Sequence, residues 1–268
     1  MGVELDPRNF FLLEESGVTR RGLNQNVEAT KLLQRAVELS PKDNYFPRIA
    51  LSQIPYFERA DLGPWRSQLN AFLEEGTEAT VNAAPLFVLC ALAERDHAAA
   101  ARALAFIPAE GTVDPYNNFL MPRDWFVGLV ARSFGETGEA RSAFAAARVS
   151  AAKTVEERPD DAQAWSMLGM VDAGLGNKSD AVAEGERACV LLPISKDAWF
   201  GCSNITNLAL IYTWVGEKDR ALEQLTTSAK IPFGVTYGEL KLSPVWDLLR
   251  GDQRFEKLVA SLAPKNSN

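Results

Sequence analysis

The chain has 268 residues, of which 47% are hydrophobic and 24% charged, with a formal net charge of −7. These values are ordinary for a folded globular protein, and the acidic balance argues against direct nucleic-acid binding, which needs a basic face. No run approaches the roughly 18 apolar residues of a membrane span, and the polar start, Met1 to Asn9, does not have the pattern of a secretory signal. We therefore expect no nucleic-acid partner and no membrane insertion by this segment.

The first half of the chain contains helical patterns that repeat weakly. In the earliest of them, Ala29, Leu33 and Ala36 fall on one helix face that ends at Pro41; proline cannot continue a helix. Comparable pairs of helical patterns, separated by turn residues, follow along the chain. We place degenerate repeats at residues 8–41, 43–76, 80–108 and 123–155.

Two clearer pairs occupy residues 160–193 and 200–232. The first has the ordered residues Trp165, Leu168, Gly169, Asp172, Gly176, Ala181, Gly185, Ala188 and Pro193. The second has Leu208, Ala209, Tyr212, Gly216, Ala221 and Leu225 at corresponding places. The spacing puts the early members of each set on one face of a helix, the glycine in a turn, and the alanines on a second helix.

The last segment differs from these pairs. Ser243 followed by Pro244 is typical of a helix start, and Asp252 is placed to cap a further helix that carries Phe255 and Val259 on its apolar side. The terminal unit of a repeat array must cover the last repeat and present a polar outside. We therefore expect a capping helix pair at residues 243–263.

The spacing from Trp165 to Pro193 resembles the tetratricopeptide repeat, whose pattern is W-x2-L-G-x2-Y, a turn, A-x3-F and a closing proline. Only Asp172 in the tyrosine position and Gly185 in the phenylalanine position depart from it. The resemblance implies an all-α fold: one domain over residues 1–268, built as a right-handed superhelical solenoid of tandem helix-turn-helix repeats.

The segment from Val215 to Pro264 resembles the end of repeat regions in large bacterial regulatory proteins. In those proteins the repeats follow a kinase, cyclase or winged-helix domain. The start, Glu4-Leu5-Asp6-Pro7, is similar to the end of a repeat's second helix. We therefore expect a fragment of a larger bacterial signalling protein, cytoplasmic by default, with an extracytoplasmic repeat domain as the alternative.

Nothing in the sequence has the spacing of a catalytic or metal site. His97 is the only histidine, and the Gly174 to Ser179 stretch lacks the glycine that must precede the lysine of a phosphate-binding loop. We expect no enzyme activity, no catalytic residue, no metal ion and no cofactor. A protein-interaction scaffold or sensory module is the favoured function. A structural spacer, or a solenoid that holds an enzyme's active site, remains as an alternative.

The resemblance places a partner on the concave side of the solenoid, which is lined by the first helix of each repeat. A protein or peptide partner is expected there. The expected binding residues lie off the core stripe of those helices: Trp125, Arg132, Gln163, Ser166, Met170, Ser203, Thr206, Leu210 and Thr213.

Overall fold

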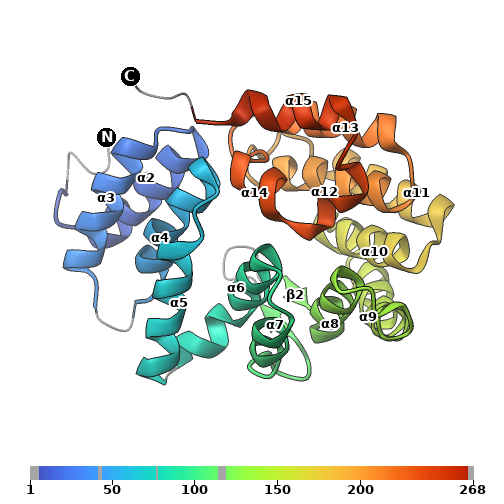
Figure 1. The fold of residues 1–268 in the computed structure, drawn as a ribbon, viewed down its shortest axis with the longest axis horizontal. Coiled ribbons are helices and arrows are strands. Elements are labelled where there is room, and N and C mark those ends of the chain that lie inside the picture. Colours follow the sequence, from blue (N-terminus) through green and yellow to red (C-terminus); the bar gives the residue numbers. More distant parts are fainter. Residues whose placement is uncertain (1–5, 42–43, 77, 114–118, 265–268) are drawn as a thin grey trace.

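The computed structural model describes residues 6–41, 44–76, 78–113 and 119–264. The helices of the N-terminal half are α2 (Phe10–Gly22), α3 (Asn26–Leu39), α4 (Phe46–Arg59), α5 (Gly63–Glu75), α6 (Glu78–Glu94) and α7 (His97–Leu104). Those of the C-terminal half are α8 (Arg123–Ser133), α9 (Thr137–Glu157), α10 (Ala162–Leu175), α11 (Lys178–Leu191), α12 (Phe200–Trp214), α13 (Lys218–Ser228), α14 (Tyr237–Leu242), the 3₁₀ helix η1 (Pro244–Leu249) and α15 (Gln253–Leu262). The predicted all-α solenoid of tandem helical pairs is confirmed (Figure 1). The start at Glu4 and Leu5 lies outside the described residues.

The clearest repeat, α10 with α11, shows why its signature residues are needed. Asp161 caps α10, because its carboxylate accepts hydrogen bonds from the backbone N–H groups of Gln163 (2.9 Å) and Ala164 (3.3 Å). A Cβ added to Gly169 would lie 3.0 Å from the Ala181 carbonyl oxygen, so α10 and α11 approach more closely than a side chain at this position would allow. The small residues in the pattern therefore set the distance between the two helices.

Two small features are additions to the predicted pattern. A pair of two-residue antiparallel strands, β1 (Thr112–Val113) and β2 (Leu120–Met121), lies between α7 and α8. Helix α14 starts with a capping box, in which the Thr236 hydroxyl and the Glu239 carboxylate satisfy each other's backbone N–H groups. The T-x-x-E spacing of that box is a recognised helix-start signal in the sequence.

The C-terminal segment packs on two different parts of the array. Helix α15 packs on α13 and α14, and the Arg254 guanidinium bonds to Asp219 at the start of α13 (2.7 Å). The 3₁₀ helix η1 instead packs on α12, where the Val245 carbonyl accepts a hydrogen bond from the Trp214 indole (3.1 Å). The segment thus covers the last repeat with α15 and sends η1 across the inner side of the array.

The solenoid curls until its two ends meet, as Figure 1 shows for α4 and α14. The Phe233 N–H donates to the Gly22 carbonyl (2.9 Å), and the Phe233 ring stacks on Trp199 with centroids 4.7 Å apart. Arg95 makes a two-pronged ion pair with Asp247 (2.6 and 2.8 Å). These contacts between distant parts of the chain turn an open array into a closed ring.

Candidate functional site

The ring encloses a cavity of about 480 Å³, a size typical of ligand sites. Aromatic side chains from four separate elements form much of its wall: Tyr56 and Phe57 of α4, Trp65 of α5, Trp125 of α8 and Trp246 of η1. The Tyr56 and Trp65 rings contact each other with centroids 5.1 Å apart. The walls therefore come from both ends of the chain and exist only because the ring closes.

Two hydrogen-bond donors in these walls lack an acceptor. The indole Nε1 of Trp65 and the amide Nε2 of Gln163 are both buried, and neither has a hydrogen-bond partner among the described residues. A buried donor without a partner costs about 1–3 kcal/mol. Neither nitrogen is accessible to water, so an occupant with acceptor oxygens would remove that cost only after a small side-chain adjustment brings a donor to the cavity surface. Such an occupant would be a carbonyl-bearing ligand.

Other polar groups in the wall are already paired. The Asn207 amide donates to the Ser166 hydroxyl (2.9 Å). The Thr206 hydroxyl bonds to the hydroxyl of Ser228 (2.8 Å). These bonds hold α10, α12 and α13 in register and leave Gln163 as the amide available to an occupant.

The electrostatics of the cavity favour uncharged groups. The described residues that line it include no lysine or arginine. Burial raises the pKa of Glu239, whose carboxylate accepts from the Thr236 N–H (2.9 Å). Burial, and next the nearby Glu239, raise the pKa of Tyr56 well above its usual value, which keeps its hydroxyl neutral. An acidic occupant would therefore meet desolvation with no lysine or arginine among the described lining residues to compensate for it.

A neighbouring pocket of about 500 Å³ lies beside the cavity, at the seam between the two ends of the ring. Both hollows share Phe57, Val235 and Glu239 in their walls. The outer pocket is also lined by Trp199 and Phe233, whose stacked rings belong to the seam.

The structure brings together most of the side chains that the sequence analysis named. Those that line the cavity are Trp125, Gln163, Ser166, Met170, Thr206 and Leu210. The sequence predicts an open groove, in which these side chains would be exposed. In the structure they are largely buried: Trp125 keeps 7% of its surface exposed and Met170 keeps 8%. The reason is that α4 and η1 cover the concave side.

The remaining three named residues lie elsewhere. Thr213 is buried, and its hydroxyl donates to the Ala209 carbonyl (2.7 Å). Ser203 lines the outer pocket at the seam. Arg132 stacks on Trp214 and lines a different pocket.

Sequence reasoning missed Trp65 and Glu239 as cavity residues, and placed Trp246 in the cap. Trp65 belongs to a degenerate repeat, and Glu239 to the unpredicted helix α14. The Pro64-Trp65 helix start was visible in the sequence, but nothing in local spacing indicates which distant helix it will face. The helix that Trp65 faces is set by the closure of the ring, which depends on contacts between residues far apart in the sequence.

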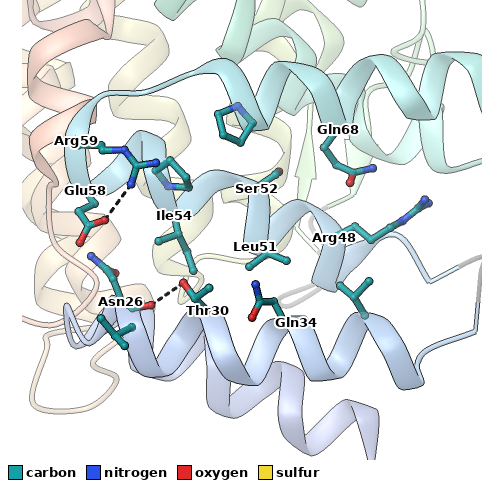
Figure 2. A pocket seen from close by; sticks show the side chains of 14 residues that line it. Asn26, Thr30, Gln34, Arg48, Leu51, Ser52, Ile54, Glu58, Arg59 and Gln68 are labelled. Carbon is teal, nitrogen blue, oxygen red and sulfur yellow. Dashed lines mark hydrogen bonds and ion pairs between the residues drawn. The ribbon is translucent and has the colours of Figure 1, made fainter.

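A second hollow lies on the outside, between α3, α4 and the start of α5 (Figure 2). It has a volume of about 550 Å³ and a mixed lining, with Val27 64% exposed at its edge. Its two arginines already pair with carboxylates, Arg48 with Glu75 (2.7 Å) and Arg59 with Glu58 (3.4 Å). The outer groove therefore presents less unmatched chemistry than the central cavity.

The described residues contain neither a metal-binding cluster nor a membrane-spanning helix. No group of three or more histidine, cysteine, aspartate or glutamate side chains in the described ranges is arranged to hold a metal ion. Within the same ranges, no helix has both the length and the apolar character to cross a membrane.

Comparison with known proteins finds matches among solved structures alone. No protein-family model matches the chain, and no curated protein gives a significant match. Among the solved structures that match is YrrB, described as a TPR protein with an unusual peptide-binding site. The match covers 97% of this chain and 96% of that one, at 12% identity and a TM-score of 0.26. The all-α fold accordingly rests on the helices themselves.

Proposed function

We propose that the chain is a protein-interaction module that binds a segment of a partner protein through its central cavity. The observation that carries the proposal is the pair of buried donors, Trp65 Nε1 and Gln163 Nε2, in a predominantly apolar wall. A peptide segment offers a complement to both features of this wall. Its backbone carbonyl oxygens can accept from the donors, and an apolar side chain can pack against the aromatic rings.

The anchor of such a segment is an uncharged apolar residue. The cavity holds aromatic and methionine side chains, including Met167 and Met170, which adapt to varied apolar shapes. Glu239 disfavours an acidic anchor, since two carboxylates in a desolvated site repel each other. The rest of the segment would leave the ring through the seam pocket beside Phe57.

The sequence resemblance supports a wider role. The likeness of residues 215–264 to the ends of repeat regions in bacterial regulatory proteins favours a module within a larger signalling protein. The complete reading frame tests this part of the proposal: a kinase, cyclase or DNA-binding domain in the same frame supports it, and a frame without such a domain contradicts it.

Short labelled peptides test the binding. Blocked peptides Gly-Ser-X-Ser-Gly, with X as phenylalanine, leucine or aspartate, are titrated by fluorescence polarisation. We expect the apolar anchors to bind more tightly than aspartate. We expect Trp65→Phe, which removes the indole N–H and keeps a ring, to weaken binding about three- to tenfold, the value of one neutral hydrogen bond.

Trp165→Phe is the matched control. Its indole N–H donates to the Pro159 carbonyl (2.7 Å), away from the cavity lining. This variant is expected to bind as the wild type does. Equal affinity of the wild type and Trp65→Phe, or a preference for the aspartate peptide, contradicts the proposal.

A further inference from the structure

A further hollow of about 560 Å³, distinct from the outer groove of Figure 2, lies between α8, α9, α12 and η1. Its wall includes Arg132, Arg141, Trp214 and Asp247. Trp214 lies 6.0 Å from Trp125 of the central cavity, measured between ring centroids. The two hollows are thus neighbours that share Val245, and of the two only this one has arginines among its described lining residues.

Arg132 is unusual among the arginines that stack on aromatic rings. Its guanidinium lies 4.3 Å from the Trp214 ring centroid, and no carboxylate of the described residues lies within ion-pairing distance. By contrast, Arg48 stacks on Phe72 and pairs with Glu75, and Arg220 stacks on Tyr212 and pairs with Glu186. In these two cases a carboxylate pairs with the stacked guanidinium.

Because Arg132 is partly removed from water, the absence of a counter-charge among the described residues beside it costs free energy. Arg132 is half-buried, and burial lowers its pKa. A charged group taken out of water without a partner is destabilising. An anion placed against this guanidinium would gain a charge-assisted hydrogen bond in partly desolvated surroundings, where such bonds are strong.

The other charges at the hollow also favour an anion. Arg141 adds a second cation. Asp247, the only carboxylate among the described lining residues, already bonds to Arg95 (2.6 Å) and to Arg250 (2.8 Å), so its charge is largely matched. A Cβ added to Gly138, also in this wall, would meet no atom within 4 Å, so the space beside it is open.

We infer that this hollow is an oxyanion-binding site, which takes a phosphate monoester or a carboxylate group against the guanidinium of Arg132, with Arg141 as the second cation. The planar fork of arginine matches both groups. The site is independent of the central cavity, and its occupant can be a free small molecule or an acidic side chain of a bound partner.

Isothermal titration with two probes tests the site. Inorganic phosphate and acetate are each titrated at pH 7.5 and constant ionic strength. We expect saturable binding of at least one probe, a loss of about tenfold or more in Arg132→Gln, and a smaller loss in Arg132→Lys, which keeps the charge without the fork. Phosphate binding alone identifies a phosphoryl ligand, and acetate binding alone or with phosphate identifies a carboxylate-accepting site.

Two further variants keep the test decisive. Arg187→Gln removes an exposed arginine of α11 outside the hollow and is expected to bind as the wild type does. Arg141→Gln is expected to weaken binding even if Arg132→Gln fails to fold, which circular dichroism would reveal. Absence of saturable binding by both probes, or unchanged affinity in a folded Arg132→Gln or Arg141→Gln, overturns the inference. The Trp65→Phe peptide assay reports separately on the central cavity.

Discussion

Asp172 is a fully buried carboxylate at the helix position where the tetratricopeptide pattern has a tyrosine. Its Oδ1 accepts hydrogen bonds from Arg148 Nε (2.7 Å) and Asn177 Nδ2 (2.6 Å). The carboxyl group of Glu184 in α11 lies close enough to feel the charge of Asp172. At this position the chain thus has, in place of the tyrosine of the tetratricopeptide pattern, a buried carboxylate whose polar contacts join α9, α10 and α11.

This network predicts a pH dependence of stability. Burial, and next the negative charge of Asp172, raise the pKa of Glu184 to about 8. Between the ordinary glutamate pKa and about 8, the folded state holds a proton on Glu184 that the unfolded state has lost. The free energy of unfolding must therefore fall as pH rises through that window.

Denaturant unfolding from pH 5 to pH 8.5 measures this effect. We expect Glu184→Gln, which stays neutral, to lose less stability over that range than the wild type loses. Glu28→Gln, at an exposed position of α3, is the control and should follow the wild-type slope. A wild-type slope retained in Glu184→Gln would show that Glu184 is not protonated in the folded protein.

At the scale of the helix pair, close contact depends on glycine. A Cβ at Gly169 would lie 3.0 Å from both the Ala181 oxygen and the Gly185 nitrogen, which are backbone atoms of α11 and cannot rotate away. We expect Gly169→Ala to destabilise the protein by about 1–3 kcal/mol, as overpacking does, measured by chemical denaturation.

Gly138, in the first turn of α9, provides the opposite case. An added Cβ there meets no atom within 4 Å, so Gly138→Ala should be neutral or stabilise by up to about 1 kcal/mol through helix propensity. Equal destabilisation by both substitutions would mean that the loss at Gly169 does not come from the α10–α11 contact.

The helices from α10 to α13 could be predicted because their signals are local. Each depends on residues within one turn or one pair, such as Asp161 as a cap or Gly176 with its positive φ of 83° at the turn. The strands β1 and β2 could not be predicted, since two-residue strands are too short to show alternation. Helix α14 carried a readable start signal in Thr236 and Glu239 that the repeat pattern did not cover.

At the scale of the whole molecule, the closure of the ring converts a predicted open groove into a partly covered cavity. The contacts responsible join residues far apart in sequence, such as Arg95 with Asp247 and Gly22 with Phe233. Local spacing carries no information on such pairs. The sequence therefore indicated which residues of α8, α10 and α12 face inward, and could not indicate what covers them.

The cavity predicts where a bound peptide's anchor must lie. Met121, Met167 and Met170 line it, whereas the outer groove of Figure 2 includes no methionine among its lining residues. A peptide with benzoylphenylalanine as its apolar anchor, which reacts readily with methionine on illumination, can therefore distinguish the two hollows by mass spectrometry.

Mapping that photo-crosslink is the most direct test of the account. We predict cross-links to Met121, Met167 or Met170, suppressed by an excess of the unlabelled phenylalanine peptide. Cross-links confined to the outer groove around Val27 and Leu51, or to other surfaces, would contradict the central cavity as the binding site.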